Sequence, residues 1–444
     1  MSLPHGWAGP TPVPTDAELE ARLAPVFERI SARAAARPRD GGSLHAEVGW
    51  LRDAGFTALR VPVALGGLGA RLGPLVDLLT DLAAAEPDLP ESLQWHLSFV
   101  EDRLGEGDDP AARQWLRRIG AGLIIGRAVP ETARPHAGGS EAAGPVASEP
   151  ILRGDGAGRL RLNGRERLGA GSRYAGAVAV SAWDDDGQRV LVVVPAGRAG
   201  VELLAGGAGM APRPADGGTA VLADVVVRPD EILPALGGDR PGRVAFGQLI
   251  RLAGLAGVAR RAADDAVELV RRRGTAGPGV GRPAGATPGP ASSGRDDPAR
   301  QQTVGKAEAA AFAARAAVRA ATASLEAALE ARDAGRPDAV RQLRAAEADV
   351  SRAEVVVVDL VLRATTDLLA VGASPTSGGD RSLDRHWRQA RTLALGHPVD
   401  AAQRAVGAYL LNGRDDRDAG PPLRSPFPAV RSLTPTPPEA SGSS

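Results

Sequence analysis

Cysteine is absent from the 444 residues of the sequence, and aromatic residues are scarce at 3%. Without cysteine the chain has no disulfide, no thiolate nucleophile, no cysteine-ligated zinc site and no iron–sulfur cluster. Long apolar runs are missing too. No segment approaches the ~18 uninterrupted apolar residues that span a bilayer, and residues 1–15 lack the apolar stretch of a secretory signal. We therefore expect a cytoplasmic protein with no membrane partner.

The chain also lacks a net charge, because Lys plus Arg and Asp plus Glu each number 53. A neutral chain has no overall field that would attract nucleic acid or an anionic membrane. We therefore expect no nucleic-acid partner, and binding sites must be sought in local clusters. The length is enough to bury a large core and allows two or three domains.

Apolar residues at helical spacing predict that the first ~120 residues are helical. Thr15 followed by Glu18 has the spacing of a capping box, in which each of the two residues caps the backbone of the other. A first amphipathic helix is expected directly after Thr15. Further helices are expected over residues 44–54, 72–85 and 91–104.

The middle of the chain changes character and favours strands. Four short β-prone runs bounded by turn residues predict strands at 160–162, 177–181, 190–194 and 219–227. This region is expected to form a compact β domain.

Helices return from Val244 onward, and one long helix is expected from residue 338 to residue 371. The four valines at 355–358 favour a strand by themselves. Charged residues on both sides of them continue a helical stripe, so we predict helix through them.

These patterns predict an α+β multidomain protein. Two segments, residues 274–294 and 414–444, are rich in Gly, Pro and Ser. They bury too little apolar surface to offset the entropy lost when a segment becomes ordered. The predicted domains are residues 1–15 disordered, 16–121 helical, 122–235 a β domain, 240–413 a helical bundle with a mobile loop at 274–294, and 414–444 a disordered tail.

Four local motifs follow one another in a fixed order. They are 55–62 leading into Gly66-Gly67-Leu68-Gly69-Ala70; Leu162-Asn163-Gly164-Arg165 leading to Gly171-Ser172; Gly218-Thr219 leading to 227–233; and Asp296-Asp297-Pro298 to Gln301 with the later run Asp384-Arg385-His386-Trp387-Arg388. Across most of residues 16–413 they resemble the acyl-CoA dehydrogenase superfamily, and in particular its flavin-dependent, dibenzothiophene monooxygenase-like branch. The resemblance implies a helical N-terminal domain, a β-barrel-like central domain and a C-terminal four-helix bundle.

The resemblance also implies a cofactor and partners. A flavin, FMN or FAD, is expected between the β domain and the bundle, with a neighbouring subunit of a homodimer or homotetramer closing the site. In an oxygenating member, a separate flavin reductase supplies reduced flavin, which reacts with O2 to oxygenate a small apolar substrate, while the protein excludes water.

Two histidines are the catalytic candidates. His96 stands where monooxygenase relatives often carry a pocket histidine that could donate a proton or act as a base. The alternative is a core histidine whose hydrogen bonds are satisfied. His397 stands one position after a family histidine, and one step on a helix rotates a side chain by about 100°. Pro398 offers a way to end the helix and turn the ring back.

Flavin contacts are implied by position in the same way. The residues are Ala128, Val129, Ala170, Gly171, Ser172, Arg273, Gln301, Gly372, Ser374 and Arg388. Arg385, Arg388 and Arg391 would share one helical face, and guanidinium groups suit phosphates or carboxylates. The alternative for these arginines is ion pairing with exposed carboxylates such as Asp384.

Several positions depart from the family pattern, and they leave three functions open. The departures are Arg127, Ala170, Thr275, Leu393 and Gly396. A flavin-dependent oxidoreductase of the monooxygenase type is the first hypothesis. A non-catalytic homologue with a structural or regulatory role is the second, because losing donors beside a developing charge can cost ~10²-fold or more in rate.

A true FAD-dependent acyl-CoA dehydrogenase is the third hypothesis. It requires a carboxylate base in an apolar pocket to remove an α-proton from a thioester. Glu347 and Glu354 are expected on a charged, solvated face and so do not supply this base, which favours the monooxygenase branch.

Overall fold

The computed structural model describes residues 12–36, 42–129, 149–156, 158–205, 217–234, 240–273, 295–372 and 384–411. Within these ranges the side chains of 35–36, 129, 272–273 and 369–372 are not described. The predicted mobile loop at 274–294 and the predicted tail at 414–444 lie outside the described residues, as do Thr275 and Ser374.

Five helices form the N-terminal part of the protein. They are α1 (Asp16–Ala36), α2 (His45–Asp53), α3 (Leu72–Ala85), α4 (Asp88–Leu104) and α5 (Pro110–Gly120). The predicted capping box is confirmed, because Glu18 N–H donates to Thr15 Oγ1 at 3.3 Å and Thr15 N–H donates to Glu18 Oε2 at 2.7 Å. The helix α5 was not predicted, and it begins where the Asp109 carboxylate accepts from Ala112 N–H at 2.7 Å.

The strands of the central region pair into one sheet. They are β1 (Ile125–Val129), β2 (Ile151–Gly154), β3 (Leu160–Leu168), β4 (Ala177–Trp183), β5 (Arg189–Pro195), β6 (Val201–Ala205), β7 (Gly218–Val227) and β8 (Ile232–Pro234). Their order is β6-β7-β3-β1-β4-β5-β8, and β2 pairs with β3 and β4. Among the described strands no pairing joins β6 to β8, so closure into a barrel is not confirmed.

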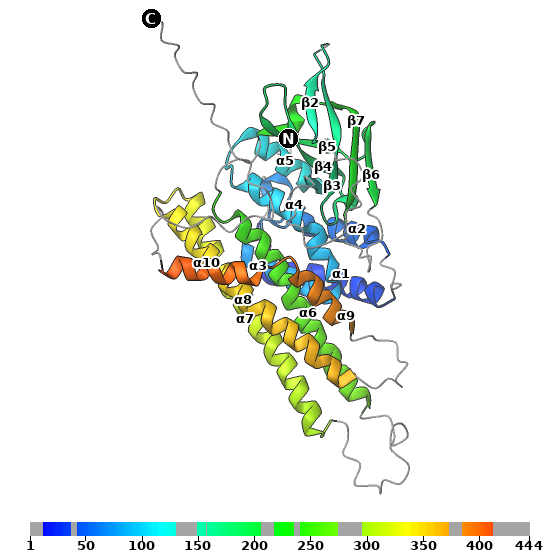
Figure 1. Ribbon diagram of the computed structural model, residues 1–444, viewed down its shortest axis with the longest axis vertical. Helices are drawn as coiled ribbons and strands as arrows, with labels where there is room; N and C mark the ends of the chain where they lie inside the picture. Colours follow the sequence, from blue (N-terminus) through cyan, green and yellow to red (C-terminus); the bar gives the residue numbers. More distant parts are fainter. Residues whose placement is uncertain are drawn as a thin grey trace, which may run out of the picture.

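The C-terminal part is helical. It consists of α6 (Arg243–Arg273), α7 (Pro298–Asp333), α8 (Ala339–Gly372), α9 (Asp384–Ala394) and α10 (Val399–Leu411). The helix predicted through the valines at 355–358 is confirmed by α8. In Figure 1 the long helices α6, α7 and α8 extend away from the sheet, with α9 and α10 lying across them.

The N-terminal helices pack on the bundle through one shared apolar core, which includes Leu79 of α3, Leu255 of α6 and Val350 of α8. Gly257 on α6 allows the closest approach, because a Cβ there would lie 2.4 Å from the Thr80 carbonyl oxygen of α3. No helix within the described ranges is long and apolar enough to cross a membrane.

Candidate functional site

Helix α4 lies against both the sheet and the bundle, and two glycines after β3 make the contact with the sheet possible. A Cβ at Gly171, where φ is +69°, would lie 2.2 Å from the carbonyl oxygen of Ser92 on α4. A Cβ at Gly169 would lie 2.3 Å from Nε1 of Trp95. Residues 169–172, which include three of the predicted flavin contacts, are therefore held directly against α4.

The side chains predicted to contact flavin in this region make internal contacts. Ser172 Oγ accepts from Arg127 N–H at 2.9 Å and donates to the Arg127 carbonyl at 3.0 Å. Ala128 on β1 is fully buried in the core of the sheet. The hydroxyl of Ser172 is engaged, so the backbone and the small side chains of these segments are what they can offer to a ligand.

Arg127 and Glu166 place two ionisable groups beside this junction. The Arg127 guanidinium lies 5.2 Å from the ring centre of Trp95, and burial, with the nearby Arg243, lowers the pKa of Arg127 to about 10. Burial raises the pKa of Glu166 to about 7, against the opposing charge of Arg127. Arg127 Nε and both Glu166 oxygens are buried and have no hydrogen-bond partner in the described part of the chain.

His96 is a core histidine with both ring nitrogens engaged. Its Nδ1 accepts from Ile125 N–H at 3.1 Å, so its Nε2 carries the proton and donates to the Thr57 carbonyl at 2.8 Å. Burial lowers the pKa of His96 to about 4. This geometry joins α4 to β1 and favours the alternative of a satisfied core histidine over a proton donor to a ligand.

His397 lies in the corner between α9 and α10, and its ring turns into the bundle. Its side chain is fully buried, and Nδ1 lies 3.2 Å from Oε1 of Glu354 on α8. The approach is off the ideal hydrogen-bond direction, and neither ring nitrogen has a well-formed partner among the described groups. Burial lowers the pKa of His397, and the nearby Glu354 opposes this effect.

The expectation that Glu354 is solvated was wrong, because its side chain is only 1% exposed. Oε2 of Glu354 accepts from Nε2 of Gln248 on α6 at 2.9 Å. The Glu354 carboxylate also interacts electrostatically with Arg251, one turn further along α6. Glu347 is more exposed, and it accepts from Gly242 N–H at 2.8 Å and from Arg344 at 3.0 Å. Gln248, Arg251, Glu354 and His397 are called the polar cluster below.

The polar cluster was missed from the sequence, although a signal for it exists. Gln248 and Arg251 are the polar residues that interrupt the apolar run from Val244 to Ala259. A polar residue inside an apolar helix must find a buried partner. Glu354 precedes the four valines at 355–358, of which Val357 and Val358 are buried.

A second set of charges lies further along α6. The Asp265 carboxylate on α6 accepts from Arg385 at 2.7 Å and lies 2.8 Å from Nε2 of His386, both on α9, and 3.1 Å from Nε of Arg261. Burial opposes the charge of Asp265, but the hydrogen bond with His386 and the two arginines outweigh it and hold the pKa of Asp265 well below its usual range.

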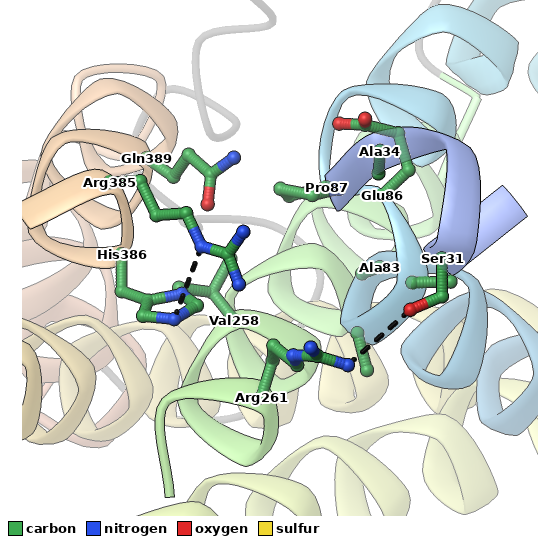
Figure 2. Close-up of a pocket in the computed structure, with 12 residues that line it drawn as sticks. Ser31, Ala34, Ala83, Glu86, Pro87, Val258, Arg261, Arg385, His386 and Gln389 are labelled. Atoms are coloured by element: carbon green, nitrogen blue, oxygen red, sulfur yellow. Dashed lines mark hydrogen bonds between the residues drawn. The ribbon is translucent and has the colours of Figure 1, made fainter. Parts of the chain in front are cut away.

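Arg261, Arg385 and His386 border a cavity of about 90 Å³. In Figure 2, Arg385 and Gln389 line one side of the cavity, Ser31 and Glu86 line the other, and Arg261 reaches in from α6. Since Arg261 and Arg385 both form ion pairs with Asp265, we interpret this set as a structural ion network.

The predicted arginine face does not act as one unit. Arg385 points inward to Asp265, Arg388 forms an ion pair with Asp384 and is half exposed, and Arg391 lies 5.5 Å from the ring centre of Trp387. The alternative of ion pairing is therefore observed for Arg388.

The other predicted flavin contacts lie apart from the polar cluster in the chain. Gln301 is exposed in the first turn of α7 and donates to the Arg295 carbonyl at 2.9 Å. Arg273 and Gly372 end α6 and α8, and their side chains, like that of Val129, are outside the description.

Comparison with known proteins matches this architecture. A family model described as "Acyl-CoA dehydrogenase, C-terminal domain" matches residues 252–397. The chain is 27% identical over 389 residues to the putative acyl-CoA dehydrogenase YdbM of Bacillus subtilis (strain 168), covering 86% of this chain and 92% of that one. It is 26% identical over 402 residues to dibenzothiophene monooxygenase of Rhodococcus qingshengii, covering 87% and 91%.

Solved structures show the same fold. Methanesulfinate monooxygenase MsuC of Pseudomonas fluorescens has a TM-score of 0.68 at 22% identity, covering 90% of this chain and 97% of that one. TdsC of Paenibacillus sp. A11-2, in complex with FMN and indole, has a TM-score of 0.70 at 22% identity, covering 89% and 97%. These matches support the resemblance to the acyl-CoA dehydrogenase superfamily and its flavin-dependent monooxygenase branch that the motifs predicted.

Proposed function

We propose that the protein is a flavin-dependent monooxygenase that uses reduced flavin and O2 to oxygenate a small organic substrate. The observation that carries the proposal is the polar cluster, a buried histidine and carboxylate between α6, α8 and the α9–α10 corner. Helix α4 lies beside the cluster, because the Glu91 charge acts on both Arg251 and His397. The same helix contacts residues 169–172 of the sheet region, and a site between sheet and bundle is where the family resemblance places the flavin.

The donor set of this region fits a flavin ring. Arg127 Nε and Arg251 Nε are buried donors without a hydrogen-bond partner among the described groups, and the pyrimidine edge of a flavin presents nitrogen and oxygen acceptors. The backbone of Ala128–Val129 and of Ala170–Gly171 would hold the ring. A bound flavin supplies the electrons that activate O2. The protein's residues orient the substrate, exclude water and move protons.

The finer architecture and the partners are part of the same proposal. They comprise a barrel-like β domain, a four-helix bundle, a homodimer or homotetramer whose neighbouring subunit closes the site, and a separate flavin reductase. The TdsC complex contains FMN, which supports FMN over FAD. The predicted domain boundaries and cytoplasmic location stay predictions.

The buried Glu354 favours a second candidate, the acyl-CoA dehydrogenase. A carboxylate that is 1% exposed beside an imidazole is the type of base that removes an α-proton. The sequence-based argument against this candidate rested on the absence of such a carboxylate, and that argument no longer holds.

One set of measurements separates the candidates. The purified protein is titrated with FMN and with FAD by fluorescence quenching, and the flavin-loaded protein is then tested in two ways. Oxygen-dependent oxidation of a small aromatic probe such as indole, driven by reduced FMN, supports the monooxygenase. Anaerobic bleaching of bound FAD by acyl-CoA of several chain lengths supports the dehydrogenase. Absence of flavin binding overturns both and supports the non-catalytic homologue.

A further inference from the structure

A second cavity, of about 290 Å³, lies where the ends of four helices meet. Its wall is formed by the C-terminal half of α4, the residues that begin α6, the last turn of α7 and the first turn of α8. The volume is close to the lower end of the range of small-molecule pockets, about 300 Å³. No member of the polar cluster and none of the described flavin contacts lines this cavity. The proposed function therefore leaves it unexplained.

The wall of the cavity is apolar on the inside and cationic near the mouth. Phe246, Leu329 and Leu343 are buried and form an apolar floor. The side chain of Arg240 is 41% exposed and that of Arg243 is 26% exposed, so these two cations lie nearer the solvent. The floor suits the apolar body of a ligand, and the arginines select the charge of its other end.

Three arginines at this cavity share two carboxylates. Nε of Arg243 lies 2.9 Å from Oδ1 of Asp102. Glu106 serves two cations, because its Oε2 lies 3.0 Å from Nη1 of Arg103 and its Oε1 lies 3.6 Å from Nη1 of Arg240. These five residues therefore carry one excess positive charge.

The remaining charged residues of the wall do not compensate for this excess. Glu101 pairs with Arg60 at 3.2 Å, and Arg332 pairs with Asp333 at 2.8 Å. Each of these pairs is neutral by itself. Among the described residues that line the cavity, no carboxylate is left to pair with the third arginine of the set.

Arg103 makes the excess charge costly, because it lies behind Glu106 and its side chain is only 1% exposed. Its Nε and Nη2 have no hydrogen-bond partner in the described part of the chain. Burial lowers the pKa of Arg103, and the charges of Arg240 and Arg243 add to this effect, against Glu106 and Asp102. Taking a cation out of water is unfavourable unless negative groups nearby compensate for its charge. A negative group in the cavity would supply this compensation.

We propose that this cavity binds a small organic acid, with the apolar body of the acid on Phe246, Leu329 and Leu343 and its carboxylate beside Arg240 and Arg243. Hydrogen bonds between guanidinium and carboxylate groups are charge-assisted and among the strongest in proteins. A ligand cation would meet the excess positive charge, and a neutral ligand would leave that charge uncompensated. The site needs no flavin, so it goes beyond the proposed function and is tested independently of it.

Isothermal titration calorimetry of the full-length protein, without added flavin, tests the charge class of the ligand. Octanoate is the probe. Octanamide has the same chain without the charge, and acetate has the charge without the apolar body. We expect octanoate to bind at least about tenfold more tightly than either control. Absence of octanoate binding, or equal affinity for octanoate and octanamide, would overturn the assignment.

The substitution Arg240→Gln tests the role of the arginines, and the exposure of Arg240 makes it compatible with folding. We expect octanoate to bind about five- to tenfold more weakly, with the affinity for octanamide unchanged. Arg341→Gln is the matched control, because Arg341 is 63% exposed on α8 and does not line the cavity. Equal losses in the two variants would show a general attraction of anions to the surface and would contradict the proposal.

The substitution Val340→Trp tests the place of binding. Val340 lines the cavity and is 52% exposed, so a larger side chain there fills the mouth without entering the core. Binding of octanoate should weaken by about tenfold or more, because the acid loses its space. Val356→Trp, at a position on the same helix that is 46% exposed and outside the wall, should leave binding unchanged. Wild-type affinity in Val340→Trp would place the acid elsewhere, for example in the empty flavin site, and would overturn the proposal.

Discussion

A Cβ at Gly396 would lie in van der Waals contact with Arg251, 3.6 Å from its Cδ. The two residues belong to different elements, α6 and the α9–α10 corner. A side chain at the exposed position 396 would therefore lie beside the side chain of Arg251.

The first prediction is a stability coupling between positions 251 and 396. Gly396→His should destabilise the protein by about 1 kcal/mol or less, because position 396 is exposed and the imidazole would meet mainly the side chain of Arg251. In the Arg251→Ala background the same change should cost less, with a coupling above about 0.5 kcal/mol. Urea unfolding of the wild type, both single variants and the double variant measures the cycle. Gly407→His, at a site on α10 with no heavy atom within 4 Å of the added Cβ, is the control, and additive effects in the cycle would contradict the coupling.

The second prediction concerns His96 and pH. Its pKa falls from 6.5 to about 4 on folding, so between these values the unfolded chain binds more protons than the folded one. The contribution of His96 to the free energy of unfolding is present in full above pH 6.5. About 3 kcal/mol of it is lost as the pH falls toward 4. His96→Gln should be less stable than the wild type at pH 7, with a flatter pH dependence between 6.5 and 4, as measured by urea unfolding.

The control for His96 is His45→Gln, which alters an exposed histidine at the start of α2. It should leave the stability at pH 7 close to that of the wild type. If His96→Gln keeps its stability but loses activity, His96 is a catalytic group and the structural interpretation is wrong.

The local parts of the fold were predictable from the sequence. The capping box of Thr15 and Glu18 and the helix through the valines at 355–358 depend on residues within one or two turns, and both are confirmed. The helix α5 and the strands β1, β2, β6 and β8 were missed. They are short, and their pairing with distant segments outweighs their weak local preference.

The polar cluster was not predictable in the same way. Whether Glu354 is solvated depends on what covers its face of α8, and the cover comes from Gln248, some hundred residues earlier, and from the corner at His397. A single helix pattern carries no record of such neighbours. His96 illustrates the converse, because its partners Thr57 and Ile125 are backbone groups that no side-chain motif reveals.

The third prediction concerns Glu166. Burial raises its pKa from 4.5 to about 7, so the folded state binds more protons between these values. The contribution of Glu166 to the free energy of unfolding is present in full below pH 4.5 and is lost as the pH rises through 7. This pH dependence is opposite in sign to that of His96. Glu166→Gln should match the wild type below pH 4.5 and exceed its stability above pH 7 by up to about 3 kcal/mol. Thermal unfolding between pH 4 and 8 measures the difference.

Glu202→Gln, which changes an exposed carboxylate on β6, is the control for Glu166 and should be neutral. If Glu166→Gln is instead destabilised at pH 8, then the Glu166 carboxylate has a net favourable interaction in the fold, with Arg127 as its nearest candidate.

The fourth prediction concerns the ion network at Asp265. Removing this carboxylate leaves Arg385 and Arg261 without their partner, and breaking a buried charged network costs about 3–5 kcal/mol. Asp265→Asn should therefore be strongly destabilised at pH 7. Because the pKa of Asp265 is held below its usual range, the stabilisation is present above the unfolded-state pKa of about 3.9 and is lost as the pH falls through the folded-state value. The difference in the free energy of unfolding between the wild type and Asp265→Asn should thus narrow below pH 4.

Asp264→Asn is the control, because Asp264 is one residue earlier on α6 and exposed, and it should cost little at any pH. A difference for Asp265→Asn that stays constant down to pH 2 would show that packing, and not charge, sets the cost.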